Sequence, residues 1–214
     1  MASTTIESFF NDDINADENL PAKQKQVLKA ALELFATKGF ANTTTADIAE
    51  KANVSQGTVY KRYTTKEELL QATLSPLIER TIPKAIKEFT AYAVSLNQPS
   101  FEELLHVLLK NRFEFVSDNR KALKVMLSES LTNPKLLAEL EQTFAQLLSS
   151  ELPMVIDKFK SYGTIVDWET QRIIQYIVSI GFGYAGQIIL LDRKFNADKA
   201  AADAANFIYR GLKK

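Results

Sequence analysis

The segment TTTADIAEKANVSQGTVYKRYTTKEELL, residues 43–70, constrains the fold more than any other part of this chain. Thr44 followed by Asp47 predicts a helix start, because a hydroxyl caps free backbone N–H groups and an acid stabilises the first turn. Ser55 predicts a second start, and Thr65 with Glu68 a third. Two short helices joined by a turn of three to four residues have the arrangement of a helix-turn-helix.

The rest of the chain also has helical spacing, and strand-like alternation bounded by turn signals is absent. The segment after Pro21 has apolar residues at Val27, Ala30, Ala31, Leu34 and Phe35, and Gly39 ends this predicted helix. Proline, asparagine and glycine residues then separate predicted helices at 84–96, 101–117, 119–131, 134–150, 153–162, 167–191 and 197–213. Pro76 and Pro83 are each expected either to kink or to break the helical chain, and the sequence leaves open which of the two occurs. The predicted fold class is all-α, with short helices first and long helices after.

Composition narrows the possible functions. The 214 residues include no cysteine and one histidine, which excludes thiolate chemistry and most histidine-based metal and catalytic sites. We therefore expect no catalytic residues, no metal site and no cofactor. The net charge is zero, yet residues 21–70 carry eight bases and five acids. Bulk charge thus gives no sign of a nucleic-acid partner, whereas its distribution favours one for residues 21–70.

The first twenty residues carry five acids and no base. They are predicted to be a mobile extension, although Ile6, Phe9, Phe10 and Ile14 share a helical face and leave a short docked helix as the alternative. The start of the chain lacks the basic region and apolar run of a signal peptide, so we expect a cytoplasmic location.

The helix-turn-helix segment has an apolar side and a polar side. Ile48, Ala49, Val54 and Val59 are spaced to pack the two helices together, and Asn53 suits a left-handed turn residue. Gly57 is unexpected inside a short helix, where it costs about 1 kcal/mol relative to alanine, and it predicts a close approach of the backbone to something large. The solvent side contains Gln56, Thr58, Tyr60, Lys61 and Arg62, a mixture that suits a DNA groove.

The run from Thr44 to Leu70 resembles the DNA-binding domain of the TetR (tetracycline-repressor-like) family. The family's "lF…kGf" run is matched by LFATKGF at 34–40. Its helix-turn-helix pattern is matched by Thr44, Asp47, Ile48, Ala49, Ala52, Val54, Ser55, Gly57, Thr58, Tyr60, Lys66, Glu67 and Leu69. Asn53 stands where the family usually has glycine, and Tyr63 where it usually has phenylalanine.

The resemblance implies roles for individual residues. It places Tyr60 and Lys66 on phosphates, and Thr44 and Thr45 where the first helix of the pair meets the DNA backbone. Gln56, Thr58 and Lys61 would face base edges, and Gly57 completes the predicted DNA-contact set. Tyr60 as a packing residue and Lys66 as a solvated surface charge stay open as alternatives.

The motif GFGYAG at 181–186 has the letter pattern of a dinucleotide-binding loop, which requires a preceding strand. No strand is predicted there, so a dinucleotide-dependent enzyme is disfavoured. Small residues on one helical face instead predict close contact with another helix. The predicted dimer interface comprises Ser179, Gly183, Gly186 and Leu190, with Ala201, Ala205 and Ile208 of the last helix, as a four-helix contact; packing inside one subunit is the alternative.

A ligand site is predicted only in outline. Large side chains on mostly apolar faces could line a cavity between helices, and they favour a largely apolar effector. The candidates are His106, Phe113, Met126, Phe144, Trp168 and Tyr176, and the alternative for each is that it is a core residue.

The resemblance to the TetR family implies that the residues after the DNA-binding module form an effector-binding and dimerisation domain. We therefore predict an acidic extension at 1–20, a DNA-binding domain at 21–70 and an effector-binding and dimerisation domain at 71–214. The protein that the resemblance implies is a homodimeric repressor that binds a near-palindromic double-stranded operator and is released by a small molecule. An activator, or a DNA binder without an effector, is the alternative within the same fold. The uncharged run 173–191 is long enough to cross a membrane, but its glutamines and glycines favour a helix buried in protein.

Overall fold

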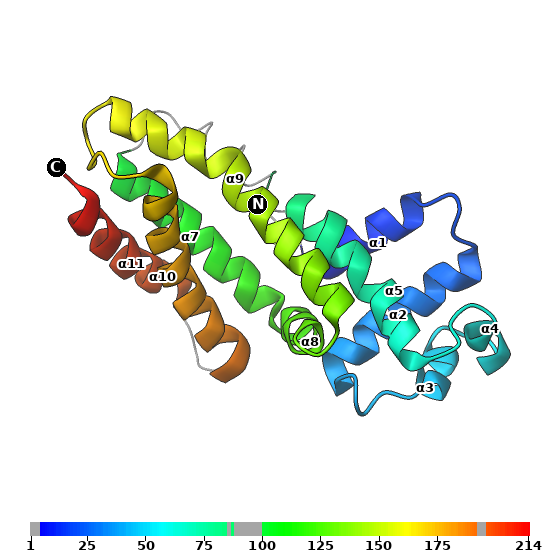
Figure 1. The fold of residues 1–214 in the computed structure, drawn as a ribbon. Helices are drawn as coiled ribbons and strands as arrows, with labels where there is room; N and C mark the ends of the chain where they lie inside the picture. Colours follow the sequence, from blue (N-terminus) through cyan, green and yellow to red (C-terminus); the bar gives the residue numbers. More distant parts are fainter. Residues whose placement is uncertain (1–4, 85–86, 88–99, 192–195) are drawn as a thin grey trace. The chain divides into compact units, whose positions relative to one another are not determined.

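The computed structural model describes residues 5–84, 87, 100–191 and 196–214, which form helices joined by loops (Figure 1). These residues divide between two compact units, Met1–Ala85 with Lys121–Thr143, and Ile86–Arg120 with Phe144–Lys214. In the described ranges, β structure is limited to one isolated bridge between Ile165 and Lys213. The predicted all-α class is confirmed.

The first unit contains the predicted helix-turn-helix and more. Its helices are α1 (Ile6–Ala16), α2 (Ala22–Lys38), α3 (Thr45–Lys51), α4 (Gln56–Tyr60), α5 (Lys66–Pro76) and η1 (Leu77–Thr81). Most of α8 (Arg120–Ser130) and the beginning of α9 (Pro134–Ser161) belong to it as well. This compact unit is thus larger than the 21–70 module, whose functional boundaries stay a prediction.

Residues 5–16 form a docked helix rather than the predicted mobile extension. The apolar face of α1 is buried against α2 and η1, and it consists of Ile6, Phe9, Phe10 and Ile14. Hydrogen bonds also hold the C-terminal end of α1, where the ammonium groups of Lys25 and Lys29 each donate to Asn15 at 2.7 Å. The acidic composition favoured mobility, but burial of four large apolar side chains outweighs it.

Pro76 widens the helix instead of breaking it. It is the last residue of α5, and the chain continues directly into η1, which is a π-helix. A missing proline N–H leaves one helical hydrogen bond unmade, and wider turns of this kind accommodate such gaps. Pro83 also lies in helical structure, whereas most of the predicted helix 84–96 falls outside the described residues.

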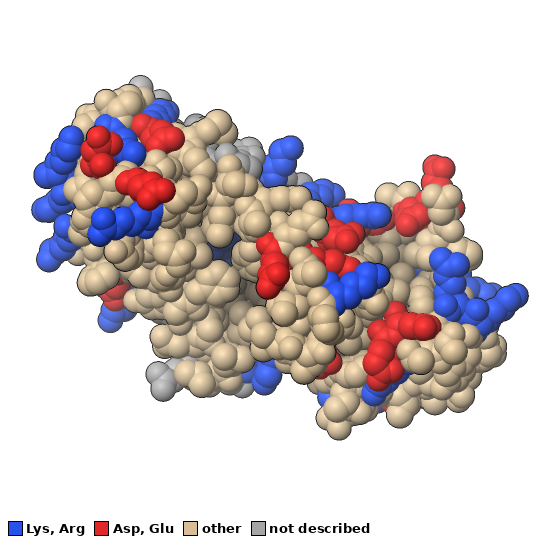
Figure 2. Space-filling model, in the orientation of Figure 1, with Lys and Arg blue, Asp and Glu red and all other residues tan. Residues whose placement is uncertain are grey.

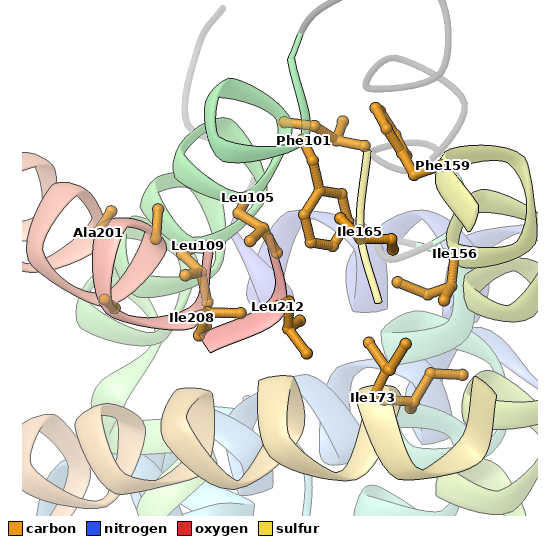
Figure 3. Packing of buried hydrophobic residues seen from close by; sticks show 14 of the residues in the cluster. Phe101, Leu105, Leu109, Ile156, Phe159, Ile165, Ile173, Ala201, Ile208 and Leu212 are labelled. Atoms are coloured by element: carbon orange, nitrogen blue, oxygen red, sulfur yellow. The ribbon is translucent and has the colours of Figure 1, made fainter. Parts of the chain in front are cut away.

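The second unit packs long helices around one apolar core. It contains α7 (Phe101–Asp118), the later part of α9, α10 (Thr170–Leu191) and α11 (Ala197–Leu212). Figure 3 shows Leu105, Leu109 and Ile208 converging where α7 meets α11. The prediction of two helices at 134–150 and 153–162 is wrong, because α9 runs through Pro153 without a break.

Candidate nucleic-acid interface

The first helix of the pair begins with the predicted cap. The backbone amide of Thr44 donates to Asp47 Oδ2 at 2.9 Å, and the amide of Asp47 donates to Thr44 Oγ1 at 3.1 Å. These bonds, with Lys38 nearby, hold the pKa of the Asp47 carboxyl below its ordinary value. The reciprocal cap fixes where α3 starts.

The turn between the two helices also follows the sequence. Asn53 has a φ of +53°, in the left-handed region that asparagine tolerates. The Ser55 hydroxyl then accepts from the Thr58 amide at 3.3 Å and caps α4. Ile48 and Ala49 of α3 and Val59 of α4 are buried, so the predicted packing side is confirmed, while Val54 is half-buried.

The opposite side of α4 is open to solvent. Gln56, Gly57 and Lys61 are exposed and Thr58 is half-buried. A Cβ atom added at Gly57 would meet only Ser55 Oγ, at an ordinary 3.8 Å. Neither the space around Gly57 nor its backbone angle requires glycine.

Tyr60 and Thr45 form a joint polar group on this surface. Their hydroxyl oxygens lie 2.7 Å apart, and Tyr60 is 49% exposed. The bond ties the end of α4 to the start of α3 and keeps both hydroxyls at the surface. The exposure of Tyr60 therefore disfavours the alternative that it is only a packing residue.

Lys66 has a different environment from the one predicted. Its ammonium donates to the carbonyls of Phe40 at 3.0 Å and Thr43 at 3.1 Å, and it lies 4.3 Å from the centre of the Phe40 ring. These contacts fix the loop that precedes α3. The geometry therefore favours a structural role for Lys66 over the predicted phosphate contact and over a free surface charge.

Charge is unevenly spread over the first unit. Figure 2 shows basic side chains gathered at the end that carries α4, with acidic side chains close by. Lys23, Lys61 and Arg62 are among the exposed cations of residues 21–70. A mixed surface with local cations can hold a polyanion at selected points without a strongly basic domain.

Comparison with known proteins identifies this segment. Residues 27–73 match the family model for bacterial regulatory proteins of the tetR family. Over 51 residues the chain is 47% identical to the HTH-type transcriptional regulator YvkB of Bacillus subtilis, covering 24% of this chain and 27% of that protein. The chain belongs to the TetR family.

The TetR fold extends over most of the chain. A TetR-family regulator from Mesorhizobium loti superposes with a TM-score of 0.71 at 17% identity, over 90% of this chain and 97% of that one. FadR of Bacillus subtilis, solved in complex with stearoyl-CoA, gives 0.65 at 17% identity, over 87% and 97%. The first curated relatives are matched over only 27 to 56% of their own length. These relatives are transcriptional regulators, in agreement with the prediction that the chain is not an enzyme.

The six predicted ligand residues are divided between the two units. Met126 is buried in the first unit, whereas the other five belong to the second. Phe113 packs its ring on Tyr184, and Trp168 pairs with the 46% exposed Tyr176. His106 Nε2 lies 3.4 Å from Asp198, which also binds Lys110 at 2.7 Å. Whether these six residues line a single pocket stays a prediction.

The predicted dimer residues divide between two environments. Ser179, Gly183 and Leu190 of α10 are exposed, and Gly186 is half-buried with open space around its Cα. By contrast Ala201, Ala205 and Ile208 are buried against the core of their own unit, where α11 packs on α7. The small-residue face of α11 thus serves a contact within the chain, which disfavours it as part of the predicted interface.

The predictions from sequence did not single out the exposed phenylalanines Phe182 and Phe207. Phe182 is 53% exposed on α10 and Phe207 is 71% exposed on α11. Both helices contain many apolar residues. The sequence alone therefore does not show that these two side chains lie outside the face that packs on the core. The missing strand before GFGYAG is also borne out, since these residues lie in the middle of α10.

The exposed face of α10 also bears on the membrane alternative. Thr170–Leu191 is the one described helix whose length and composition would allow it to cross a membrane, and 17% of its most apolar window is buried. The expectation of a helix buried within the protein is thus not met by a single copy of the chain.

Proposed function

We propose that this chain is a homodimeric transcriptional repressor of the cytoplasm that binds a two-fold symmetric operator and is released by a small, largely apolar ligand. The observation that carries the proposal is the solvent side of α4. It combines hydrogen-bonding side chains with a glycine that neither the packing nor the backbone of the protein requires. Such a surface suits a helix that lies in the major groove.

The exposed groups match the chemistry of duplex DNA. Gln56 can bond adenine through both amide atoms, and Lys61 can donate to guanine or to a phosphate. Of the paired hydroxyls of Thr45 and Tyr60, one donates to the other, and the remaining O–H can donate to a phosphate oxygen at the edge of the groove. Thr58 has its hydroxyl 3.0 Å from Ser55 Oγ, so its methyl group is the part suited to a thymine methyl.

A second copy of the chain is the partner we propose for the exposed face of α10. Tyr176, Phe182, Leu190 and Leu191 are exposed large side chains on this helix. A Cβ atom added at Gly183 or Gly186 would meet nothing within 4 Å, so another helix can approach closely there. Contiguous exposed apolar surface of this kind marks an interaction site, and a two-fold operator requires a two-fold protein.

Ligand release follows from the two-fold arrangement. A dimer engages half-sites about 34–36 Å apart, so a change in the separation of the two α4 helices prevents simultaneous binding. A ligand shifts this equilibrium only by its different affinity for the two states. FadR of Bacillus subtilis, which shares the fold, was solved with stearoyl-CoA, and this supports an effector with a large apolar part.

The experiment is a selection of bound fragments from genomic DNA by the purified full chain, followed by titration of the recovered sequence. We expect a near-palindromic site that is bound at least about a thousandfold more tightly than unrelated duplex at physiological salt. Gln56→Ala should change the preferred base at one position in each half-site, whereas Gln146→Ala, an exposed glutamine outside the first unit, should not. Equal affinity for selected and random duplex would refute the proposal.

A further inference from the structure

The recognition helix α4 is too short to hold itself in place. It has five residues, and isolated helices below about 12–15 residues are marginal in water. After α4 the chain makes a tighter turn than an α-helix: the amide of Arg62 donates to the carbonyl of Val59, three residues back, at 3.1 Å. The amide of Tyr63 donates to the same carbonyl at 3.0 Å. The carbonyl of Thr58, which an α-helical turn would pair with Arg62, is thereby left without a backbone donor.

A side chain from another helix bonds this carbonyl. Gln24, near the start of α2, donates from Nε2 to the Thr58 carbonyl at 3.2 Å across 34 positions of the chain. Since a carbonyl only accepts, the amide nitrogen of Gln24 must be the atom that faces it. Gln24 therefore supplies the donor that the backbone of α4 does not.

We propose that Gln24 is a positioning residue for base recognition, which holds the C-terminal end of α4 at a fixed angle on α2. The inference rests on the proposed DNA-binding function. Thr58 belongs to the predicted base-facing set, and its amide is already held by Ser55 on the other side. With Gln24 on its carbonyl, Thr58 is fixed at both ends of its peptide backbone.

Burial excludes a direct role in contacting DNA. Gln24 is 9% exposed, so its amide cannot reach a phosphate or a base edge without leaving its site. Its oxygen Oε1 is buried with no hydrogen-bond partner among the described residues. A buried unpaired oxygen is unfavourable, and an apolar side chain of similar size would avoid it. Stability alone thus does not account for a glutamine here, whereas the need for a donor does.

The test compares Gln24→Leu, which removes the donor at similar volume, with Gln26→Leu, an exposed position on the same helix. We expect Gln24→Leu to bind the selected operator about tenfold more weakly and to lose most of its discrimination against single-base variants of that operator. Affinity for random duplex and the slope of affinity with salt should stay as in the wild type, because no phosphate contact is removed. Gln26→Leu should match the wild type throughout. Gln24→Arg, which restores a donor of sufficient length, should recover part of the discrimination.

Hydrogen exchange of the amides at 57–63 is measured on the same proteins without DNA. Faster exchange in Gln24→Leu, but not in Gln26→Leu, would support the tie to Thr58 independently of any operator. Unchanged exchange with unchanged base discrimination would overturn the inference, as would a uniform loss of affinity for all duplexes with an altered salt slope. If the wild type shows no preference for any duplex, the proposed function fails, and exchange still decides whether Gln24 holds α4.

Discussion

Replacing Gly57 by alanine should make the protein more stable and a poorer DNA binder. The two effects have opposite signs because they arise in different places. Within the chain, a Cβ at this position meets only Ser55 Oγ at 3.8 Å, and the backbone does not have the positive φ that would strain alanine. In the proposed complex, the same methyl group points from the exposed side of α4 toward the DNA.

The stabilisation can be estimated from helix propensity. Glycine inside a helix is about 0.8–1.0 kcal/mol less favourable than alanine, and no clash within the protein reduces this gain. The loss of binding follows from overpacking at a close contact, which costs about 1–3 kcal/mol. At about 1.4 kcal/mol for each factor of ten, affinity should fall roughly 5- to 150-fold at each half-site.

Chemical unfolding and operator titration measure the two quantities on one preparation. Gly163→Ala serves as the contrasting variant, because Gly163 has a φ of +68° and alanine there should destabilise the protein. A Gly57→Ala protein that is more stable and still binds the operator as tightly as the wild type would refute the argument that DNA is the reason for this glycine. A Gly57→Ala protein that is less stable would show that the chain itself needs glycine at this position.

Three further predictions follow from other parts of the structure. Phe10→Ala should lower the free energy of unfolding by about 3–5 kcal/mol, because the ring is fully buried, whereas the exposed Glu7→Ala should have little effect in the same urea titration. Since the folded pKa of Asp47 is depressed, its stabilising effect is complete above the ordinary carboxyl pKa and is lost as pH falls through the lower folded value. The stability difference between wild type and Asp47→Asn should therefore shrink in acid, and a difference independent of pH would contradict this. Gly183→Leu should sediment as a monomer without detergent and lose the operator; if it stays dimeric, α10 is not the interface, and if the wild type requires detergent, the membrane alternative gains support.

Local signals in the sequence were sufficient for the helix-turn-helix. Thr44, Ser55 and Thr65 each start a helix as predicted, Gly39 follows the end of α2, and Asn53 has the positive φ value expected of it. Such features depend on a few neighbouring residues, so a single sequence carries them. The contact between Gln24 and Thr58 depends on the tertiary packing of α2 on α4, and no local pattern indicates it.

Lys66 shows a similar limit for side-chain roles. The sequence places a lysine at the start of a helix near the predicted interface, which is compatible with a phosphate contact. Whether its ammonium is free depends on the carbonyls of a loop more than twenty residues away, and here two of them accept hydrogen bonds from it. Residue type and position therefore did not predict the bonds of Lys66.

The two C-terminal helices show why a small-residue face does not by itself indicate a subunit interface. The predicted faces of α10 and α11 are alike in composition, and periodicity alone cannot say which element each one packs against. In the structure the alanine face of α11 is used up by α7, and α10 keeps its glycine face open beside exposed Phe182 and Leu190. Because α7 covers the alanine face of α11, the glycine face of α10 is the one of the two that stays available to a second copy of the chain. The dimer argument therefore depends on α10, and on the outward side of α11 that carries Phe207, rather than on the alanines.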